Sequence, residues 1–410
     1  MSTDYDIVIV GSGLVGTSLA VALAATRHRV ALVDRRAFKQ DDDTVEQPYD
    51  ERSLALGYGS KKIYQGIGVW ETLKAGAAAI DRVHVSEQGR LGVTRLNSQD
   101  FGLPALGYVV TVRHLAATLA AAMEAQENLS LLMPATLQTL DTGPDCVTLQ
   151  LDRAGQSKTI STRLMVATDG ANSVARTLLG IDTQASNYHQ QAVIANITPE
   201  KAHHFEAFER FTLNGPIALL PIDEKRCSLV WTHTPEGAEQ VMQLSDDDFL
   251  SRLQQHFGYR LGRLIKVGKR AVYPLKLVLA DRLIAPRSVV MGNAAHTLHP
   301  IAGQGLNLAL RDVALLAEQV ANREDPGEWA GLWGYADVRM PDIQATARAT
   351  DGLLRLFTQP LPWLAHARGA GLIAMDRLPW VKARVARFGM GFRDELQGDL
   401  FQGHQGEIPL

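Results

Sequence analysis

A strand, a glycine-rich turn and a helix at the N-terminus constrain the fold more than any other feature. The run DIVIV, residues 6–10, has the unbroken apolar character of a buried strand, and the turn GSGLVG follows with Gly11, Gly13 and Gly16. A small, apolar helical stretch comes next, and a second strand, RVALVD, ends at Asp34. Together these features predict a βαβ unit that binds a dinucleotide.

Each position of such a fingerprint has a physical task. Gly11 permits the tight turn, Gly13 lets a pyrophosphate approach the backbone, and Gly16 lets the helix pack closely on the strand. The helix amino terminus offers free N–H groups to the phosphates, and Asp34 can accept hydrogen bonds from a ribose. Arg35 has two readings, as a contact to a 2′-phosphate or as an ordinary surface arginine. The fingerprint fits NAD and FAD equally.

A second strand–turn unit, LMVATDGANSVAR, ends its strand in Asp169 and Gly170. An aspartate at the carboxyl end of a strand in an α/β fold lies at the edge of the sheet where ligands bind. Ser173 is the predicted N-cap of the helix that follows. A capped turn without a ligand is the alternative reading of this unit when it is taken alone.

A third unit, SVVMGNAAH, runs into Gly292 and Asn293 and is followed at once by the loop PIAGQGLN. We expect this loop, from Pro300 through Gly303, to lead into a helix. Its first N–H groups would then face an electron-rich ring edge such as that of a flavin, because a helix amino terminus stabilises negative charge. The residues expected to present these groups are Gly305, Leu306 and Asn307.

The three motifs, in this order, resemble the class A flavoprotein aromatic hydroxylases of the p-hydroxybenzoate hydroxylase type, over residues 5–355. The stretches DERSLALGYGSKKIYQGIGVWETL and AFERFTLNGPIALLPIDEKRCSLVW are similar to the ubiquinone-biosynthesis hydroxylases. The nearest branch is 2-polyprenyl-6-methoxyphenol hydroxylase. One departure is Asn293, where the family has aspartate; its amide oxygen can still accept a hydrogen bond.

The resemblance implies an α/β fold, with an FAD-binding Rossmann-like domain of the glutathione-reductase type, an inserted antiparallel β-sheet substrate domain and a helical C-terminal segment. The expected division is an FAD-binding domain in three parts (1–75, 111–182 and 276–340), substrate-domain strands at 76–110, the substrate sheet at 183–275, and the helical segment at 341–410.

The resemblance also implies the cofactor site. Two arginines match positions on the flavin side of FAD, Arg52 in DERSLAL and Arg113 in TVRHL, although each could instead form an ordinary surface ion pair. The complete set of expected FAD-binding residues is Gly11, Gly13, Gly16, Asp34, Arg35, Arg52, Arg113, Asp169, Gly170, Gly292, Asn293, Pro300, Gly303, Gly305, Leu306 and Asn307.

The resemblance further implies the reaction chemistry of the family. NAD(P)H reduces FAD and is expected to bind transiently, because only one full dinucleotide fingerprint is present. O2 then gives a flavin C4a-hydroperoxide that hydroxylates a polyprenyl phenol. The base that ionises the phenol is not identified. His189, Arg210 and His299 are candidates, as are His204 and His233, and a structural role is open for each. Two flavin-fold rivals stay open: a reductase or oxidase acting on an isoprenoid, and a non-catalytic lipid-binding scaffold.

The pair His296 and His299 does not predict a metal site. Pro300 breaks any helix that would align the two rings, and no carboxylate or cysteine is suitably spaced to add a third ligand. We therefore expect no metal, and a structural role or a contact with flavin or substrate for these histidines.

Composition bounds the remaining possibilities. The net charge of −3 over 410 residues gives no reason to expect a nucleic-acid partner. Cys146 and Cys227 form no close-spaced motif, which favours a reducing, cytoplasmic compartment. The N-terminus lacks a signal-peptide pattern, and no apolar run reaches the ~18 residues of a membrane span. Peripheral contact with a membrane stays open.

The C-terminal stretch 363–393 combines basic and apolar residues. It carries Arg368, Arg377, Lys382, Arg384, Arg387 and Arg393 but a single acid, Asp376. Leu378, Val381, Val385 and Phe388 share one side of a helix, and Trp363 and Trp380 flank them. A basic amphipathic helix can lie on an anionic membrane, bind another ubiquinone-biosynthesis protein or pack on its own domain.

Overall fold

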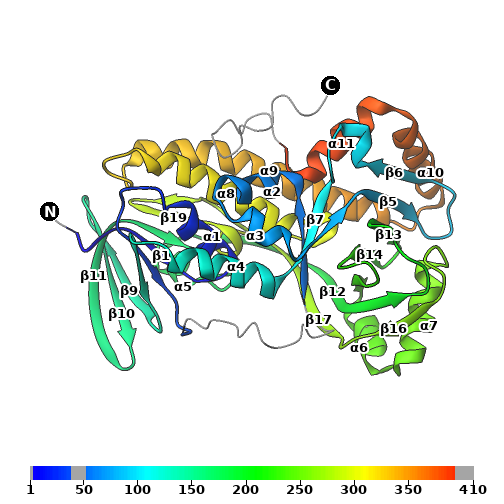
Figure 1. Cartoon of the computed structure of the whole chain (residues 1–410), viewed down its shortest axis with the longest axis horizontal. Coiled ribbons are helices and arrows are strands. Elements are labelled where there is room, and N and C mark those ends of the chain that lie inside the picture. The colour runs from blue at the N-terminus through cyan, green and yellow to red at the C-terminus, as the bar shows by residue number, and fades with distance from the viewer. Residues whose placement is uncertain (1–2, 38–51, 393–410) are drawn as a thin grey trace.

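The computed structural model describes residues 3–37 and 52–392, and these form three β-sheets covered by helices (Figure 1). A parallel sheet carries the N-terminal strand at its centre. Its strand order is β18 (Ile284–Ala285), β19 (Ser288–Val290), β11 (Gln156–Ala167), β1 (Tyr5–Val10), β2 (Val30–Val33) and β8 (Leu129–Leu132), with β18 antiparallel to β19. A hairpin of β9 (Thr136–Thr142) and β10 (Val147–Arg153) adds antiparallel to β11 and projects from the body.

Helices cover the parallel sheet, which is why the central parts of its strands are apolar: Ile7, Val8 and Ile9 of β1 are all fully buried. Helix α1 (Leu14–Ala22) packs on α8 (Gln304–Ala321) and on α4 (Val112–Glu124), and α9 (Trp329–Thr358) lies beside α8. The shorter helices of this half are α2 (Tyr58–Gly66), α3 (Trp70–Lys74) and α5 (Val174–Leu178).

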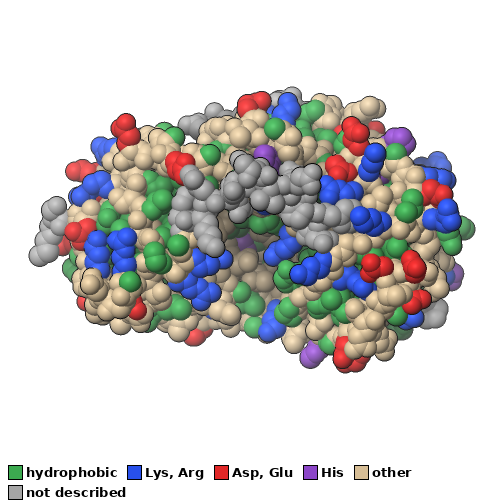
Figure 2. Space-filling view, turned by 60° about the horizontal axis from the view of Figure 1, so that its bottom comes forward, with side chains coloured by type: hydrophobic (Ala, Val, Ile, Leu, Met, Phe, Trp, Pro, Cys, Tyr) green, Lys and Arg blue, Asp and Glu red, His purple; other side chains and the backbone are tan. Residues whose placement is uncertain are grey.

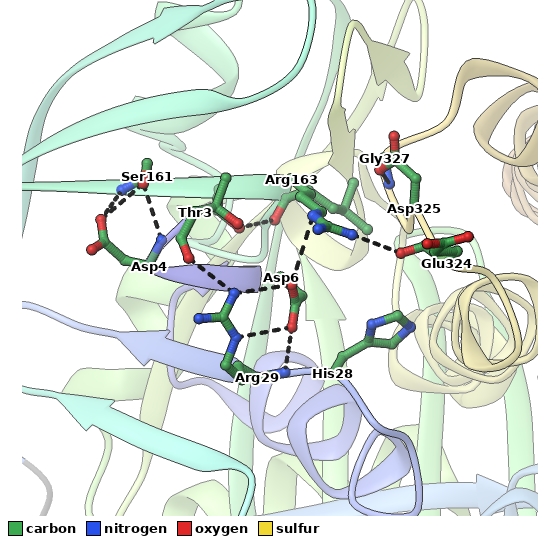
Figure 3. Close-up of polar contacts among 12 residues, drawn as sticks. Thr3, Asp4, Asp6, His28, Arg29, Ser161, Arg163, Glu324, Asp325 and Gly327 are labelled. Atoms are coloured by element: carbon green, nitrogen blue, oxygen red, sulfur yellow. Dashed lines mark hydrogen bonds and ion pairs between the residues drawn. The ribbon is translucent and has the colours of Figure 1, made fainter. Parts of the chain in front are cut away.

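The amino-terminal end of the parallel sheet is tied together by polar contacts (Figure 3). Asp6 accepts hydrogen bonds from Arg29 at 2.9 Å (backbone N) and 3.2 Å (side chain), and Arg163 of β11 lies 3.8 Å from its carboxylate. Arg163 also donates to the carbonyl of Glu324 at 2.8 Å, in the segment between α8 and α9. These contacts close the end of the sheet opposite the glycine turns and leave the carboxyl ends of the strands for a ligand.

A small three-stranded sheet joins the two larger ones, in the order β3 (Ser53–Gly57), β7 (Gly107–Thr111) and β4 (Ala77–Ile80). The second large sheet confirms the prediction of an inserted, mainly antiparallel sheet; among the described residues its one parallel pair is β13 with β5. Its order is β20 (His296–Thr297), β17 (Ala271–Ala280), β12 (Thr183–Pro199), β15 (Cys227–His233), β14 (Gly215–Pro221), β13 (Glu206–Thr212), β5 (Arg82–Glu87) and β6 (Val93–Asn97), with β16 (Leu264–Val267) on β12.

Two helices, α6 (Pro235–Gln243) and α7 (Asp246–Phe257), cover one face of this nine-stranded sheet. Buried residues of both helices form one hydrophobic core with strand residues such as Phe208, Leu219 and Leu229. The opposite face is turned toward the FAD-fingerprint half of the molecule, because Phe211 of β13 packs against Ile301 and Phe357.

The C-terminal segment is helical, as the sequence predicts, with α10 (Pro362–Arg377) and α11 (Pro379–Met390) after α9. The sequence counts Arg368 among the basic residues of this amphipathic segment, but the structure removes it from the exposed face. Arg368 is only 4% exposed, and its guanidinium lies 2.5 Å from Glu87 of β5, where burial makes a paired cation necessary. Residue 393 and the tail beyond it lie outside the described residues. Across the described chain, no helix is both long and apolar enough to cross a membrane.

Candidate active site

The three sequence motifs meet at the carboxyl ends of neighbouring strands. Val10 of β1 pairs with Ala167 of β11, and Ala167 pairs in turn with Val290 of β19, so the turns that follow these strands lie side by side. The Thr168 hydroxyl donates to the Gly11 carbonyl at 2.8 Å, which joins the first two motifs. In an open α/β sheet this edge is where ligands bind.

The glycine turn has the shape that a pyrophosphate needs. A Cβ on Gly16 would lie 1.9 Å from the Gly11 carbonyl oxygen, so glycine is required there for helix and strand to approach. Gly11 has φ of +111°. At Gly13, in contrast, a Cβ would meet no heavy atom within 4 Å. The open side of Gly13 at the start of α1 therefore fits a phosphate group held by helix N–H groups.

Asp34 follows β2 and is held by the glycine turn itself. Its carboxylate accepts hydrogen bonds from the Ser12 N–H and hydroxyl, both at 2.8 Å, and from the Arg36 N–H at 2.8 Å. Burial alone would raise the pKa of Asp34, but these hydrogen bonds outweigh it and lower the pKa. The arginine that pairs with this carboxylate is Arg36, at 3.6 Å, while Arg35 is exposed. The carboxylate is thus ionised and fixed at the edge of the motif.

Asp169 of the second motif caps a helix. Its carboxylate accepts from the Ser173 hydroxyl and from the Ala175 N–H at 3.1 Å. Ser173 is the N-cap of α5, as predicted, and accepts from the Arg176 N–H at 2.9 Å. Arg176 in turn donates to the Ala294 carbonyl at 2.8 Å, which links the second motif to the third. Gly170, beside Asp169, has φ of +90° and open space around it.

Buried contacts with α8 and α1 hold the third motif in place. The Gly292 N–H donates to Asp312 of α8 at 3.3 Å, and the His296 ring lies 2.6 Å from the same carboxylate. Gly292 also packs against Val15 of α1, since a Cβ there would lie 3.0 Å from the valine. Asn293, by contrast, is exposed. The motif therefore buries its glycine and histidine and presents Asn293 outward.

The loop that follows leads into the amino terminus of α8. Residues 301–303 form a 3₁₀ turn after Pro300, and Gly303 caps α8 in the left-handed conformation. The first N–H groups of a helix have no partner within it, so Gly305 and Leu306 can offer theirs to a ligand.

Asn307, the third residue expected to contact the ring, uses its side chain for structure. The amide oxygen accepts from the Gly57 N–H at 2.8 Å and the Ser60 hydroxyl at 2.6 Å. The amide nitrogen donates to the carbonyls of Ala55 at 3.0 Å and Gly303 at 2.7 Å. Asn307 thereby fastens β3 to the start of α8 and sets the position of the loop.

The two predicted cofactor-side arginines lie on elements next to this loop. Arg52, exposed, immediately precedes β3, and its guanidinium lies 4.9 Å from the centre of the Tyr273 ring on β17. Arg113 is half-buried in the first turn of α4. Figure 2 shows a hollow near the middle of the face that it draws, with Lys and Arg side chains on both of its sides. Positive charge beside a hollow suits an anionic ligand.

Of the three candidate bases, only His299 lies next to the predicted flavin loop. It is fully buried: its Nδ1 accepts from the Ile301 N–H at 3.2 Å, its ring meets Tyr188 edge-on at 5.3 Å, and burial lowers its pKa to about 4. Arg210 points to the helix-covered face of the sheet, where it donates to the His256 carbonyl at 2.9 Å. His189 is exposed at a bulge in β12.

The two further histidines also lie away from the loop. His233 packs against Trp231 at 4.2 Å on the helix-covered face, and His204 is exposed.

Sequence reasoning missed Glu209, the neighbour of Arg210. Because side chains alternate along a strand, Glu209 and Phe211 face the FAD-fingerprint half while Phe208 and Arg210 face α7. Burial raises the pKa of Glu209 to about 8. The alternating pattern of AFERF holds this information, but it does not say which of the two faces borders the site.

Among the described residues, no three His, Cys, Asp or Glu side chains are grouped to hold a metal ion. His296 is engaged with Asp312, and His299 with the backbone of its own loop.

Comparisons with known proteins agree with this geometry. The family described as FAD binding domain matches residues 4–350. The chain is 33% identical over 390 residues to ubiquinone hydroxylase UbiL of Rhodospirillum rubrum, covering 94% of this chain and 89% of that protein. It is 31% identical over 390 residues to 3-demethoxyubiquinol 3-hydroxylase of Escherichia coli, covering 94% and 98%.

Among solved structures, p-nitrophenol 4-monooxygenase PnpA from Pseudomonas putida shares the fold, with a TM-score of 0.76 and 17% identity over 96% of this chain and 100% of that one. The family match spans most of the chain, and the two relatives span nearly all of it. The chain therefore belongs to the FAD binding domain family of flavoprotein monooxygenases and, within it, to the ubiquinone-biosynthesis hydroxylases.

Proposed function

We propose that this chain uses FAD, NAD(P)H and O2 to hydroxylate a polyprenylated phenol on the route to ubiquinone. The observation that carries the proposal is the contact between the inserted sheet and the loop of the third motif: Phe211 of β13 packs with Ile301 of that loop in one apolar cluster. A phenol ring on this face of the sheet would lie beside a flavin held at the amino terminus of α8.

The residues present fit FAD. The adenosine and pyrophosphate half would lie at Gly13, the amino terminus of α1 and Asp34, where open space and a fixed carboxylate are present. The ring half would lie along Gly292 and the N–H groups that open α8. When bound, FAD supplies the redox chemistry, taking a hydride from NAD(P)H and transferring one oxygen atom of O2 to the ring. The chain itself must orient the phenol and keep water away.

The names of the relatives support a polyprenylated ring as the substrate class. A relative of 31% identity is named for 3-demethoxyubiquinol. The sequence motifs also resemble the branch that acts on 2-polyprenyl-6-methoxyphenol. Both are polyprenylated rings with an oxygen substituent. We take the 6-methoxyphenol as the first substrate to test and the demethoxy compound as the second.

The C-terminal helices suggest how a water-insoluble phenol reaches the site. Leu372 of α10 belongs to the apolar cluster of Phe211 and Ile301, so the inner side of this helix walls the proposed ring site. Its outer side and α11 expose Trp363 (67%) and Trp380 (71%), with the exposed Arg377 and Arg384 nearby in the sequence. Exposed tryptophan with arginine is suited to an anionic lipid surface. We propose that α10 and α11 contact the membrane, with a ubiquinone-biosynthesis protein as the alternative partner.

Vesicle binding separates these partners. The holoprotein should sediment with vesicles containing an anionic lipid and much less with neutral ones, and Trp380→Ser should weaken the binding. Binding to neither kind of vesicle would favour a protein partner, and equal binding to both would show that the exposed arginines do not contribute to membrane contact.

The function itself is tested by product analysis. The purified holoprotein, supplied with NAD(P)H, O2 and a short-chain prenyl methoxyphenol, should yield a product that has gained one oxygen atom. Oxidation of NAD(P)H without a hydroxylated product would instead indicate a reductase or oxidase. Deletion of the gene in its host should cause the methoxyphenol precursor to accumulate; accumulation of a different intermediate would reassign the substrate.

A further inference from the structure

One row of side chains crosses the centre of the nine-stranded sheet on the face turned toward the cofactor motifs. Val85 of β5 pairs with Glu209 of β13, Glu209 with Ala218 of β14, Ala218 with Val230 of β15, and Val230 with Ile194 of β12. We call these five residues the central row. Four are apolar, and Glu209 is the single ionisable member.

The neighbouring row on the other face provides a direct comparison. Phe208, Leu219, Leu229 and Ala195 occupy the next register positions and are all buried, at 5%, 0%, 0% and 3% exposed, beneath α6 and α7. All five members of the central row are only half-buried. The sheet is therefore fully packed on its helix-covered side, while its other side keeps accessible space around the central row.

The surroundings of this space are apolar and aromatic. Phe211, next to Glu209 on the same face, stacks on Phe357 of α9 with ring centres 3.8 Å apart, and Ile301 and Leu372 complete the cluster. Such a surface can receive an aromatic ring and a prenyl chain. Within the described part of the chain, the Glu209 carboxyl takes part in no hydrogen bond or ion pair. A half-buried carboxyl that has no partner and lies beside an apolar surface is a candidate for a functional group.

The other titratable groups on the elements packed against this face either form ion pairs of their own or are neutral. Glu87 of β5 is paired with Arg368 of α10, and Asp351 of α9 with Arg355 at 2.8 Å. Burial keeps His299 neutral by lowering its pKa. Burial also raises the pKa of Tyr188 to about 12. The ring of Tyr273 lies under the guanidinium of Arg52. Strand β4, which packs on β14, has no titratable side chain. Burial alone accounts for the raised pKa of Glu209, about 8.

We propose that Glu209 is the catalytic residue that takes the proton from the phenol hydroxyl of the substrate; this inference rests on the proposed function. The phenol O–H bond breaks, its electron pair stays on the ring oxygen, and the proton forms an O–H bond on the Glu209 carboxylate. The resulting phenolate is more electron-rich and therefore more reactive toward an electrophilic oxygen. Glu209 then returns the proton to the ring oxygen of the product.

The chemistry favours this residue over an ordinary carboxylate. A phenol ionises near pH 10 and a solvated glutamate near 4.3, a mismatch of about 6 units that makes proton transfer unfavourable. The elevated pKa of Glu209 reduces the mismatch to about 2 units, so the proton is shared much more evenly.

The test compares Glu209→Gln with Glu206→Gln in the FAD-loaded protein. Gln keeps the size of the side chain but cannot titrate, and Glu206 lies on the same strand with its side chain on the opposite face. The probe is a nitrophenol with a short prenyl chain, because its phenol and phenolate forms absorb differently. Bound to the wild-type protein or to Glu206→Gln, it should ionise in two steps, since the phenol and Glu209 are coupled. Bound to Glu209→Gln, it should ionise in one.

A kinetic readout accompanies the spectra. Hydroxylation by Glu209→Gln should fall about 100-fold in kcat and lose the rise near pH 8, with probe affinity changed less than about 3-fold. Glu209→Asp, which keeps a carboxylate, should retain two ionisation steps and lose less activity; this variant also serves if Glu209→Gln is unstable. Identical ionisation curves for wild type and Glu209→Gln would overturn the role of Glu209 alone. A wild-type protein that binds and hydroxylates no phenol would overturn both this role and the proposed function.

Discussion

His296 Nε2 lies 2.6 Å from Asp312 Oδ2, and solvent reaches 1% of the histidine side chain and none of the aspartate. The other oxygen of Asp312 accepts from Arg339 Nε at 2.7 Å, and Arg339 also pairs with Asp342. The buried charges thus join the third motif, through α8, to the long helix α9. Burial opposes ionisation of Asp312, but Arg339 and His296 outweigh it and hold the pKa of this carboxyl below its usual value.

Asp312→Asn is expected to destabilise the protein strongly. The change leaves Arg339 and its neighbours with an uncompensated positive charge in the interior, and breaking a buried pair costs roughly 3–5 kcal/mol. Urea unfolding at pH 7.5 measures the loss. Glu328→Gln is the matched control, because the Arg323–Glu328 pair is exposed (35% and 56%) and its loss should cost under about 1 kcal/mol. Equal effects of the two variants would contradict the structural role of the buried network.

Gly13→Val and Gly16→Val should fail in different ways. A Cβ at Gly13 meets no protein atom, so the variant should fold with near-normal stability but lose FAD, because the added side chain occupies the space of the pyrophosphate. A Cβ at Gly16 would lie 1.9 Å from the Gly11 carbonyl, so this variant should lose stability as well. Flavin absorbance and thermal unfolding separate the two outcomes. Normal flavin content in Gly13→Val would rule out the proposed cofactor site.

Asn293→Asp should leave FAD bound. The side chain is exposed, so a new carboxylate pays no large desolvation cost, and aspartate is the residue that the resembled family has at this position. Flavin content and fluorescence after gel filtration check the outcome. Loss of flavin from this variant would show that negative charge is not tolerated beside Gly292.

Asn307→Asp should weaken the junction between β3 and α8. The second carboxylate oxygen would face the carbonyls of Ala55 and Gly303, which now accept hydrogen bonds from the amide nitrogen. Two donors are lost and like partial charges are brought together, so a cost of about 2–4 kcal/mol is expected. Urea unfolding would measure it, with Asn307→Gln as a comparison that keeps the donors but misplaces them. Unchanged stability in Asn307→Asp would contradict the bonding pattern.

The sequence predicts the three cofactor motifs and their strands well, because each motif is local: an apolar run, a turn and a helix start lie within about 20 residues. The contacts that decide the rest are distant in the chain. Arg368 reads as part of a basic face, yet its partner is Glu87, 281 residues away. Alternation separates Glu209 from Arg210, but only the packing of α6 and α7 shows which of them borders the site. Periodicity can identify two faces of a strand without revealing what covers each.

Acid should destabilise the fold before its ion-paired carboxylates are protonated. Burial lowers the pKa of His84, His233 and His299 to about 4 each, with nearby positive groups adding to the effect at His84 and His233. In the unfolded chain the same rings take up a proton near pH 6.5. The stability from these neutral rings is therefore fully present above about pH 6.5 and is lost as the pH falls toward 4, by at most about 1.4 kcal/mol per histidine per pH unit. Urea unfolding at pH 7.5 and pH 5.5 gives the change in the free energy of unfolding with pH.

The variant His84→Phe keeps a ring against Phe208, whose centre lies 5.8 Å from that of His84, and removes one titrating group. The free energy of unfolding of this variant should therefore change measurably less with pH. A variant with the wild-type slope would mean that His84 charges without cost and that its burial does not control its pKa.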